Sequence, residues 1–112
     1  MKKVDAVIRE EQLPVVLAAL SELGYPGITL TPVKGHGRQK GIKQIYRGRE
    51  FTVDFLPKIK IELIVSDSAA AKIVDSITEH ARTGAVGDGK IWVTNVESLT
   101  RVRTGDVGEE AI

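Results

Sequence analysis

The chain has 112 residues, of which sixteen are basic and fifteen acidic, and it contains no cysteine. This length is typical of one domain with one modest core, so we expect a single domain over residues 1–112. The absence of cysteine excludes disulfides, thiolate chemistry and cysteine-ligated zinc, and a net charge of +1 excludes strong whole-chain attraction to nucleic acid or acidic membranes.

The N-terminal sequence MKKVDAVIREEQ carries charge before any apolar stretch develops, so it does not predict a signal peptide. No segment approaches the roughly 20 apolar residues of a membrane span. We therefore expect a cytoplasmic location.

Hydrophobic spacing predicts the regular elements, through alternation in the strands and a 3.6-residue period in the helices. In chain order they are strand 4–8, helix 13–23, strand 28–33, strand 58–65, helix 70–81 and strand 91–96. Gly24 is expected to end the first helix, and Ser66 with Asp67 can cap the second. This order predicts an α+β fold, a ferredoxin-like βαββαβ sandwich with a long loop between its second and third strands.

The long loop runs from Gly37 to Asp54 without a sustained apolar period. It is strongly basic for a nearly neutral protein, with Arg38, Lys40, Lys43, Arg47 and Arg49 against Glu50. One interpretation is a solvated hairpin tip. The other is a binding arm, because loops held on a rigid scaffold often carry function.

A second glycine-rich segment, GAVGDGK, has the spacing of a phosphate-binding P-loop through Gly84, Gly89 and Lys90. Ile91 stands where the Mg²⁺-binding Ser or Thr of that motif should be, and a helix precedes the loop instead of a strand. P-loop nucleotide hydrolysis is therefore not predicted. Backbone amides and a lysine can still cradle phosphate, and the alternative is a simple turn between helix and strand.

Near the C-terminus, Arg101 and Arg103 lie two residues apart and are expected on one side of an extended segment. Paired guanidiniums suit phosphate groups. The alternative is an exposed pair on an edge strand.

These segments together carry a family resemblance. The run KGHGRQKGIKQIYRGREFTVDFLPKIKIE, at 34–62, resembles the nitrogen regulatory protein P-II family, and TGAVGDGKIWVTNV and RVRTG are similar to its C-terminal signature and close. The likeness covers nearly the whole chain. It implies a homotrimeric signal transducer, not an enzyme, which binds ATP or ADP competitively, and 2-oxoglutarate with Mg-ATP, in clefts between subunits.

The resemblance also implies three functional loops: a T-loop at about 37–54, a B-loop at about 82–90 and a C-terminal loop at about 101–112. The implied nucleotide-binding residues are Thr29, Gly35, Gly37, Arg38, Ile64, Gly87, Asp88, Gly89 and Lys90, with Arg101 and Arg103 from the neighbouring subunit. Gln39 would bind Mg²⁺ beside the ATP phosphates. The implied 2-oxoglutarate residues are Gln39, Gly41 and Lys58.

The T-loop would report ligand occupancy to a target. Arg47 matches the family's arginine that enters the pore of Amt-type ammonium transporters, which would bring the protein to the membrane; control of glutamine synthetase or nitrogenase without transporter binding is the alternative. In the family's uridylylation signature the modified tyrosine is replaced here by Phe51, and the serine phosphorylated in some members by Arg49. We therefore expect no covalent modification and regulation by small ligands alone.

Two other classes of protein are less consistent with the sequence. An RNA-binding sheet would stack bases on aromatic residues, yet the chain is only 4% aromatic and has no RNP-like strand. No nucleic-acid partner is expected. A nucleotide-using enzyme would need a carboxylate paired with a nucleophile or a histidine base, and no such pairing stands out.

Overall fold

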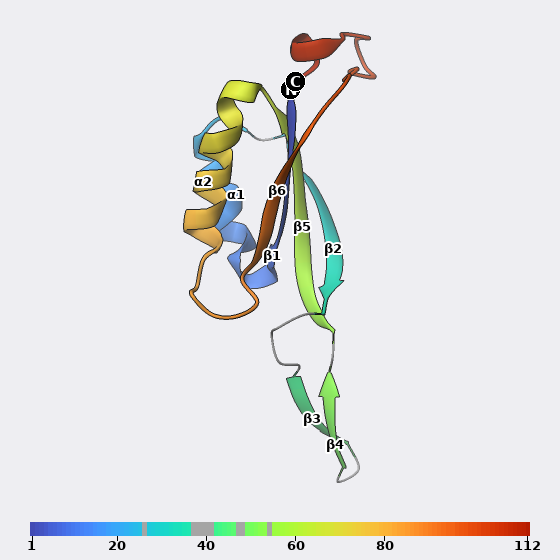
Figure 1. The fold of residues 1–112 in the computed structure, drawn as a ribbon. Coiled ribbons are helices and arrows are strands. Elements are labelled where there is room, and N and C mark those ends of the chain that lie inside the picture. Colours follow the sequence, from blue (N-terminus) through green and yellow to red (C-terminus); the bar gives the residue numbers. More distant parts are fainter. Residues whose placement is uncertain (26, 37–41, 47–48, 54) are drawn as a thin grey trace.

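The computed structural model describes residues 1–25, 27–36, 42–46, 49–53 and 55–112, and for 42–46 and 49–53 it describes the backbone alone. Four strands form one antiparallel sheet in the order β2-β5-β1-β6. They are β1 (Lys2–Arg9), β2 (Thr29–Gly35), β5 (Leu56–Val65) and β6 (Gly89–Asn95). Two helices, α1 (Leu13–Glu22) and α2 (Ala70–Ala81), lie on one face of this sheet (Figure 1). The predicted ferredoxin-like arrangement is confirmed.

The core lies between the sheet and the two helices. Because side chains alternate along a strand, every second residue of β1 and β5 meets the helices. The apolar pairs on this face are Val4–Leu63, Ala6–Ile61 and Ile8–Ile59. The helices add Val16, Leu20, Ile73 and Ile77, all fully buried. The alternation and the helical period therefore place the core correctly.

The end of α1 follows the prediction. Gly24 adopts a φ of +89°, and the amides of Gly24 and Tyr25 donate to the carbonyls of Ser21 and Leu20. This is the Schellman arrangement, in which glycine relieves the steric cost of a positive φ.

The start of α2 differs from the prediction. A short 3-10 turn, Asp67–Ala69, precedes the helix, so Ser66 and Asp67 stand one turn too early to cap it. The Ser66 hydroxyl contacts the hydroxyl of Ser68 at 3.3 Å, and the Asp67 carboxylate pairs with the Met1 ammonium at 2.8 Å.

In the described part of the chain, both α-helices lie on one face of the sheet, and the other face carries charged side chains around one buried carboxylate. Asp5 is 2% exposed, and Lys3 and Lys60 approach its Oδ1 at 3.4 and 3.8 Å. Lys60 also pairs with Glu62 at 2.9 Å, and its Nζ lies 5.9 Å from the centre of the Trp92 ring. We call this side the open face.

Two further strands, β3 (Ile42–Tyr46) and β4 (Arg49–Val53), pair as an antiparallel hairpin within the predicted loop. The hairpin extends beyond the ends of β2 and β5 (Figure 1). A hairpin was one of the two interpretations of this basic segment, although its apolar and aromatic residues follow no sustained period; they include Ile42, Ile45, Tyr46, Phe51 and Val53. Aromatic and β-branched residues favour strands even where strict alternation is missing.

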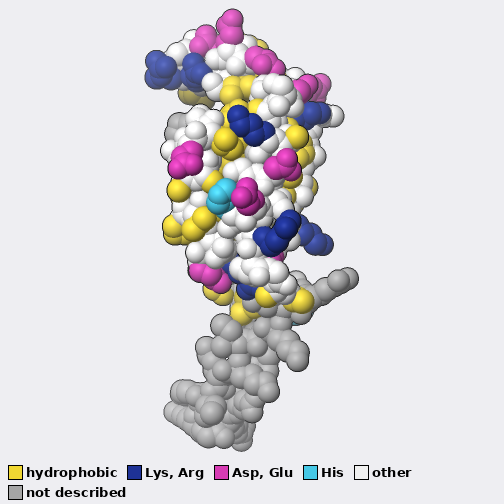
Figure 2. Space-filling view, turned by 90° about the vertical axis from the view of Figure 1, so that its left-hand side faces the viewer, with side chains coloured by type: hydrophobic (Ala, Val, Ile, Leu, Met, Phe, Trp, Pro, Cys, Tyr) yellow, Lys and Arg dark blue, Asp and Glu magenta, His cyan; other side chains and the backbone are white. Residues whose placement is uncertain are grey.

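On the helix side, acidic and basic side chains are interspersed with apolar ones (Figure 2). Within the described ranges, neither helix is long and apolar enough to cross a membrane.

Candidate functional site

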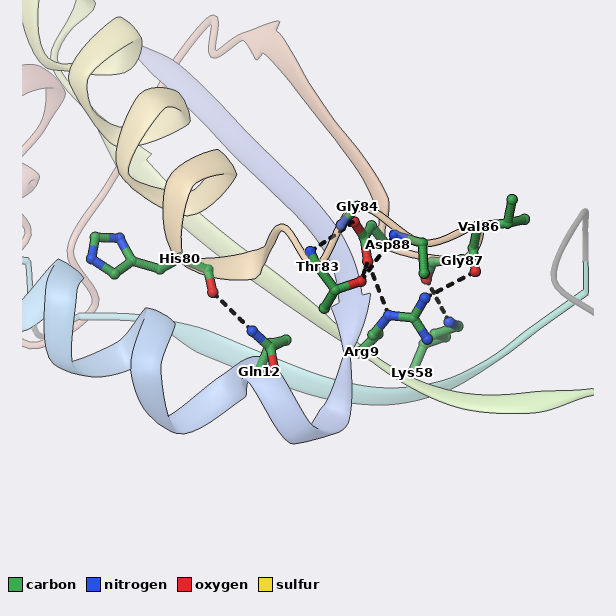
Figure 3. A network of polar contacts seen from close by, with 10 residues as sticks. Arg9, Gln12, Lys58, His80, Thr83, Gly84, Val86, Gly87 and Asp88 are labelled. Carbon is green, nitrogen blue, oxygen red and sulfur yellow. Dashed lines mark hydrogen bonds and ion pairs between the residues drawn. The ribbon is translucent and has the colours of Figure 1, made fainter.

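The loop between α2 and β6 is folded around the side chain of Asp88 (Figure 3). The Asp88 carboxylate accepts hydrogen bonds from the backbone amides of Thr83 and Gly84, at 2.8 and 2.9 Å, and from the Thr83 hydroxyl. The hydrogen bond from the Thr83 side chain is the largest influence on the pKa of Asp88 and, with the other donors, holds it well below its usual range. Asp88 is thus an ionised centre that organises the glycine-rich loop.

Glycine is required where this loop enters β6. Gly89 has a φ of +104°, and a Cβ at this position would lie 1.8 Å from the carbonyl oxygen of Val7. No side chain could be accommodated without moving the backbone of β1. Gly87 also has a positive φ, of +106°.

Two cations from neighbouring strands reach the same loop. Arg9 on β1 donates from Nε to the Asp88 Oδ1 at 3.0 Å and from Nη2 to the Val86 carbonyl at 2.9 Å. Lys58 on β5 donates from Nζ to the Gly87 carbonyl at 2.7 Å. Figure 3 shows both side chains directed at the loop. The loop is therefore attached to the sheet through both strands.

Lys58 is 8% exposed. Burial lowers the pKa of its ammonium, the charge of Arg9 lowers it further, and Glu11 and Asp88 act in the opposite direction. An anion in contact with Lys58 would favour the charged form.

A cavity of about 740 Å³ lies beside the loop, within the usual range for small-ligand sites. Its lining residues are Val7, Gly35, His36, Leu56, Lys58, Ala85, Val86, Gly87, Asp88, Gly89, Lys90 and Trp92. At Gly35 a Cβ would lie 3.0 Å from Cγ of Lys58, so glycine leaves room for the lysine stem. Two lysine ammoniums and the loop backbone give the cavity the chemistry of an anion site.

The structure gathers six of the predicted site residues at this cavity: Gly35, Lys58, Gly87, Asp88, Gly89 and Lys90. Four others, Thr29, Ile64, Arg101 and Arg103, do not line it. Thr29 pairs with Glu62 and Ile64 with Lys3, further along the sheet, and the two arginines follow the distal end of β6. One chain therefore holds the predicted site as two separate groups, which we call the loop group and the distal group.

The extended segment predicted around Arg101 and Arg103 was wrong, because these residues lie in a turn. The Gly105 amide donates to the Arg101 carbonyl at 2.8 Å. The Arg101 guanidinium pairs with Asp106 at 3.2 Å and donates to the Ile112 carbonyl at 3.0 Å. The turn closes because Asp106 also accepts from the hydroxyl of Thr104.

Arg9 is the contact that sequence reasoning missed. Its signal was its position at the end of the first strand. In an antiparallel pair with the last strand, that end lies beside the loop that follows the second helix.

Gly37, Arg38, Gln39, Gly41 and Arg47 lie outside the described residues, and Phe51 is described through its backbone in β4 alone. Among the residues that the structure does describe, no group of three or more His, Asp or Glu side chains could hold a metal ion.

Comparisons with a family model and with known proteins agree on one family. A family model described as nitrogen regulatory protein P-II matches residues 1–106. The chain is 50% identical to the nitrogen regulatory protein P-II of Rhizobium meliloti (strain 1021) and 51% identical to that of Azospirillum brasilense. It is 48% identical to that of Pasteurella multocida (strain Pm70). Each alignment covers 112 residues and the full length of both chains.

Proposed function

The chain belongs to the nitrogen regulatory protein P-II family, whose members are nitrogen-regulatory signal transducers, and we propose that it senses ATP or ADP together with 2-oxoglutarate. The observation that carries this proposal is the cavity between the Asp88-centred loop, Lys58 and Lys90. Its charges suit a ligand with phosphate and carboxylate groups.

The phosphates would lie against the loop. The backbone amides of Val86 and Gly87 donate no hydrogen bond to the described residues, so they are available to phosphate oxygens. Lys90 begins β6 at the wall of the same cavity. We propose binding rather than catalysis because Asp88, the carboxylate nearest the proposed phosphates, already accepts four hydrogen bonds. Three come from the loop and one comes from Arg9.

The second half of each nucleotide site would come from another copy of the chain. Strand β6 has seven residues and separates the loop group from the distal group by about 20 Å. Two such groups on one chain complete each other only across an interface between copies. We propose a homotrimer, in which Thr29, Ile64, Arg101 and Arg103 of one subunit face the loop group of its neighbour. The open face and its half-exposed Trp92 support burial of this side.

For 2-oxoglutarate we propose that Lys58 pairs with the distal carboxylate. Mg²⁺ bound by Gln39 and the ATP phosphates would hold the other end, with a backbone contact from Gly41. A ligand carboxylate at Lys58 would replace or share its present acceptor, the Gly87 carbonyl. Since Gly87 belongs to the phosphate loop, both ligands would act on one segment.

The basic arm at 37–54 would convey the ligand state to a target. We propose an Amt-type ammonium transporter, with Arg47 entering its pore, so that a cytoplasmic protein becomes peripheral at the membrane when bound. Because Phe51 has no hydroxyl to modify, ligand binding alone would set the state of the arm. Mass spectrometry of protein from nitrogen-limited cells tests this, and a nucleotidylated peptide covering 43–58 would contradict it.

Titration calorimetry of 2-oxoglutarate, with Mg-ATP and then with ADP, tests the ligand proposal. Binding with Mg-ATP alone is the expected result. Binding with neither nucleotide would limit the protein to an ATP/ADP sensor and overturn the roles of Gln39, Gly41 and Lys58. Sedimentation should give a mass three times the 12.2 kDa of one chain, and pull-down of a co-expressed transporter separates that target from a nitrogen-assimilation enzyme.

A further inference from the structure

We propose that Arg9 is a positioning residue for the phosphate loop, which it holds in its binding conformation and whose one carboxylate it neutralises. This inference rests on the proposed nucleotide function. Arg9 itself does not line the cavity; its influence on a ligand would pass through Asp88 and Val86. It lies 79 residues away from Asp88 in sequence.

The contacts of Arg9 fix the loop at two points. Nε donates to the Asp88 carboxylate, and Nη2 donates to the carbonyl of Val86, two residues earlier. The guanidinium is planar and presents its donors in a fixed fork, so the two bonds orient the loop and do not merely attract it. The Arg9 side chain is 11% exposed. A mostly buried cation of this kind needs a defined partner, and here the loop supplies it.

The charge of Arg9 matters as much as its geometry. Asp88 lines the cavity in which phosphates are proposed to bind, and its lowered pKa keeps it ionised. An uncompensated carboxylate there would repel an anionic ligand. Arg9 compensates that charge without itself lining the cavity. The loss of binding affinity caused by removing Arg9 should therefore increase with the negative charge of the ligand, from adenosine through ADP to ATP.

A purely structural role predicts a different pattern. If Arg9 only stabilised the fold, its removal would lower the unfolding temperature and affect all three ligands equally. Ligand charge thus separates positioning at the phosphate loop from general stabilisation.

The experiment measures the affinities of ATP, ADP and adenosine for the full-length wild type, Arg9→Gln, Arg9→Lys and Lys72→Gln. Lys72 is an exposed residue of α2, so its variant controls for the loss of one positive charge. We expect Arg9→Gln to weaken ATP at least about tenfold, ADP less, and adenosine within about twofold. Arg9→Lys keeps the positive charge but loses the fork of guanidinium donors, so its affinity for ATP should lie between those of the wild type and Arg9→Gln. It also remains informative if Arg9→Gln does not fold.

Two further measurements test the route through Asp88. In Asp88→Asn the additional change Arg9→Gln should weaken ATP binding less than it does in the wild type, because the bond between Arg9 and the Asp88 carboxylate is already lost and only the bond to the Val86 carbonyl remains. Amide exchange of Gly84, which donates to Asp88, should accelerate in Arg9→Gln, while that of Ile61 in the core should not.

Either of two results would overturn the inference: an ATP affinity of Arg9→Gln within about twofold of Lys72→Gln, or an equal loss for adenosine and ATP. A wild type that binds no nucleotide would overturn the proposed function and this inference together. If the wild type binds nucleotide and Arg9→Gln binds it equally well, the inference about Arg9 is overturned and the proposed function stands.

Discussion

Arg9 and Lys58 stand directly opposite each other on the antiparallel strands β1 and β5, and both donate hydrogen bonds to the loop that precedes β6. Like charges opposite each other in a sheet are unfavourable. Arg9 pairs with the Asp88 carboxylate, and Lys58, which lines the cavity, donates to the Gly87 carbonyl. Arg9 does not line the cavity, so Lys58 is the cation of this pair that an anion bound there would meet.

Replacing Lys58 by methionine tests this asymmetry. Methionine retains an apolar stem in the buried position and removes the ammonium. Loss of the repulsion and of the desolvation cost opposes loss of the ammonium's polar contacts, among them the bond to the Gly87 carbonyl, so the net change in the free energy of unfolding should be small, about 1 kcal/mol. The heat of 2-oxoglutarate binding with Mg-ATP should disappear.

The control for Lys58→Met is Lys60→Met, two residues along the same face, where the ammonium pairs with Glu62 outside the cavity. It should leave 2-oxoglutarate binding intact. An unchanged 2-oxoglutarate affinity in Lys58→Met would contradict the proposed role of this lysine.

Gly89→Ala and Gly24→Ala form a matched pair. Both glycines have a positive φ, +104° and +89°, but a Cβ meets the Val7 carbonyl at Gly89 and open space at Gly24. Gly24→Ala should cost about 1 kcal/mol through φ alone, and Gly89→Ala at least about 3 kcal/mol, since β1 must also move. Urea denaturation compares them. Equal losses would mean that the close approach to Val7 adds nothing.

The core could be predicted from the sequence because local periodicity decides it. Val4, Ala6 and Ile8 alternate along a strand, and Ile73 and Ile77 recur on one side of a helix. The spacing of the apolar residues therefore predicts which face of each element is buried. Gly24 was equally predictable, since a positive φ after a helix favours glycine wherever it occurs. The family resemblance added the loop residues around Lys90, which composition and spacing left ambiguous between a phosphate site and a simple turn.

The remainder depends on contacts between distant segments. The position of Arg9 at the end of β1 points to the loop before β6, but the residues beside it do not identify Asp88 as its partner. Nothing near Asp88 in the chain shows that its side chain turns into the loop. The separation of Thr29 and Arg101 from Lys90 follows from strand register and direction. The turn at Arg101 depends on Asp106 and on the Ile112 carbonyl, whereas two arginines in alternation predict an extended conformation.

Asp88→Asn should alter the dependence of stability on acid. The folded-state pKa of Asp88 lies below its ordinary value of 3.8, so the unfolded chain binds more protons in the acid range. The contribution of Asp88 is therefore present above about pH 4 and lost as the pH falls through the folded-state pKa. Asp88→Asn should be less stable than wild type by about 1–2 kcal/mol at pH 7, with a gap that narrows in acid.

Urea midpoints at pH 7 and at successive lower values measure this gap. Asp75→Asn is the control, because Asp75 is exposed on α2 and its side chain makes no hydrogen bond or ion pair with the described residues. It should follow the wild type at every pH. A gap for Asp88→Asn that stays constant in acid would mean that the carboxylate charge does not stabilise the loop.

Subunit complementation provides the sharpest test of the divided site. Lys90→Gln damages the loop group and Arg103→Gln the distal group, so each variant alone should lose ATP binding in all of its sites. In a trimer that mixes the two, one interface joins the intact loop group of the Arg103 variant to the intact distal group of the Lys90 variant, and about one functional site per mixed trimer should return. Co-expression with two affinity tags isolates the mixed trimers, and calorimetry counts their sites. Mixing Arg103→Gln with Arg101→Gln, both in the distal group, is the matched control and should restore no intact site. Recovery in the control as well, or in neither mixture, would mean that the two groups do not meet between subunits.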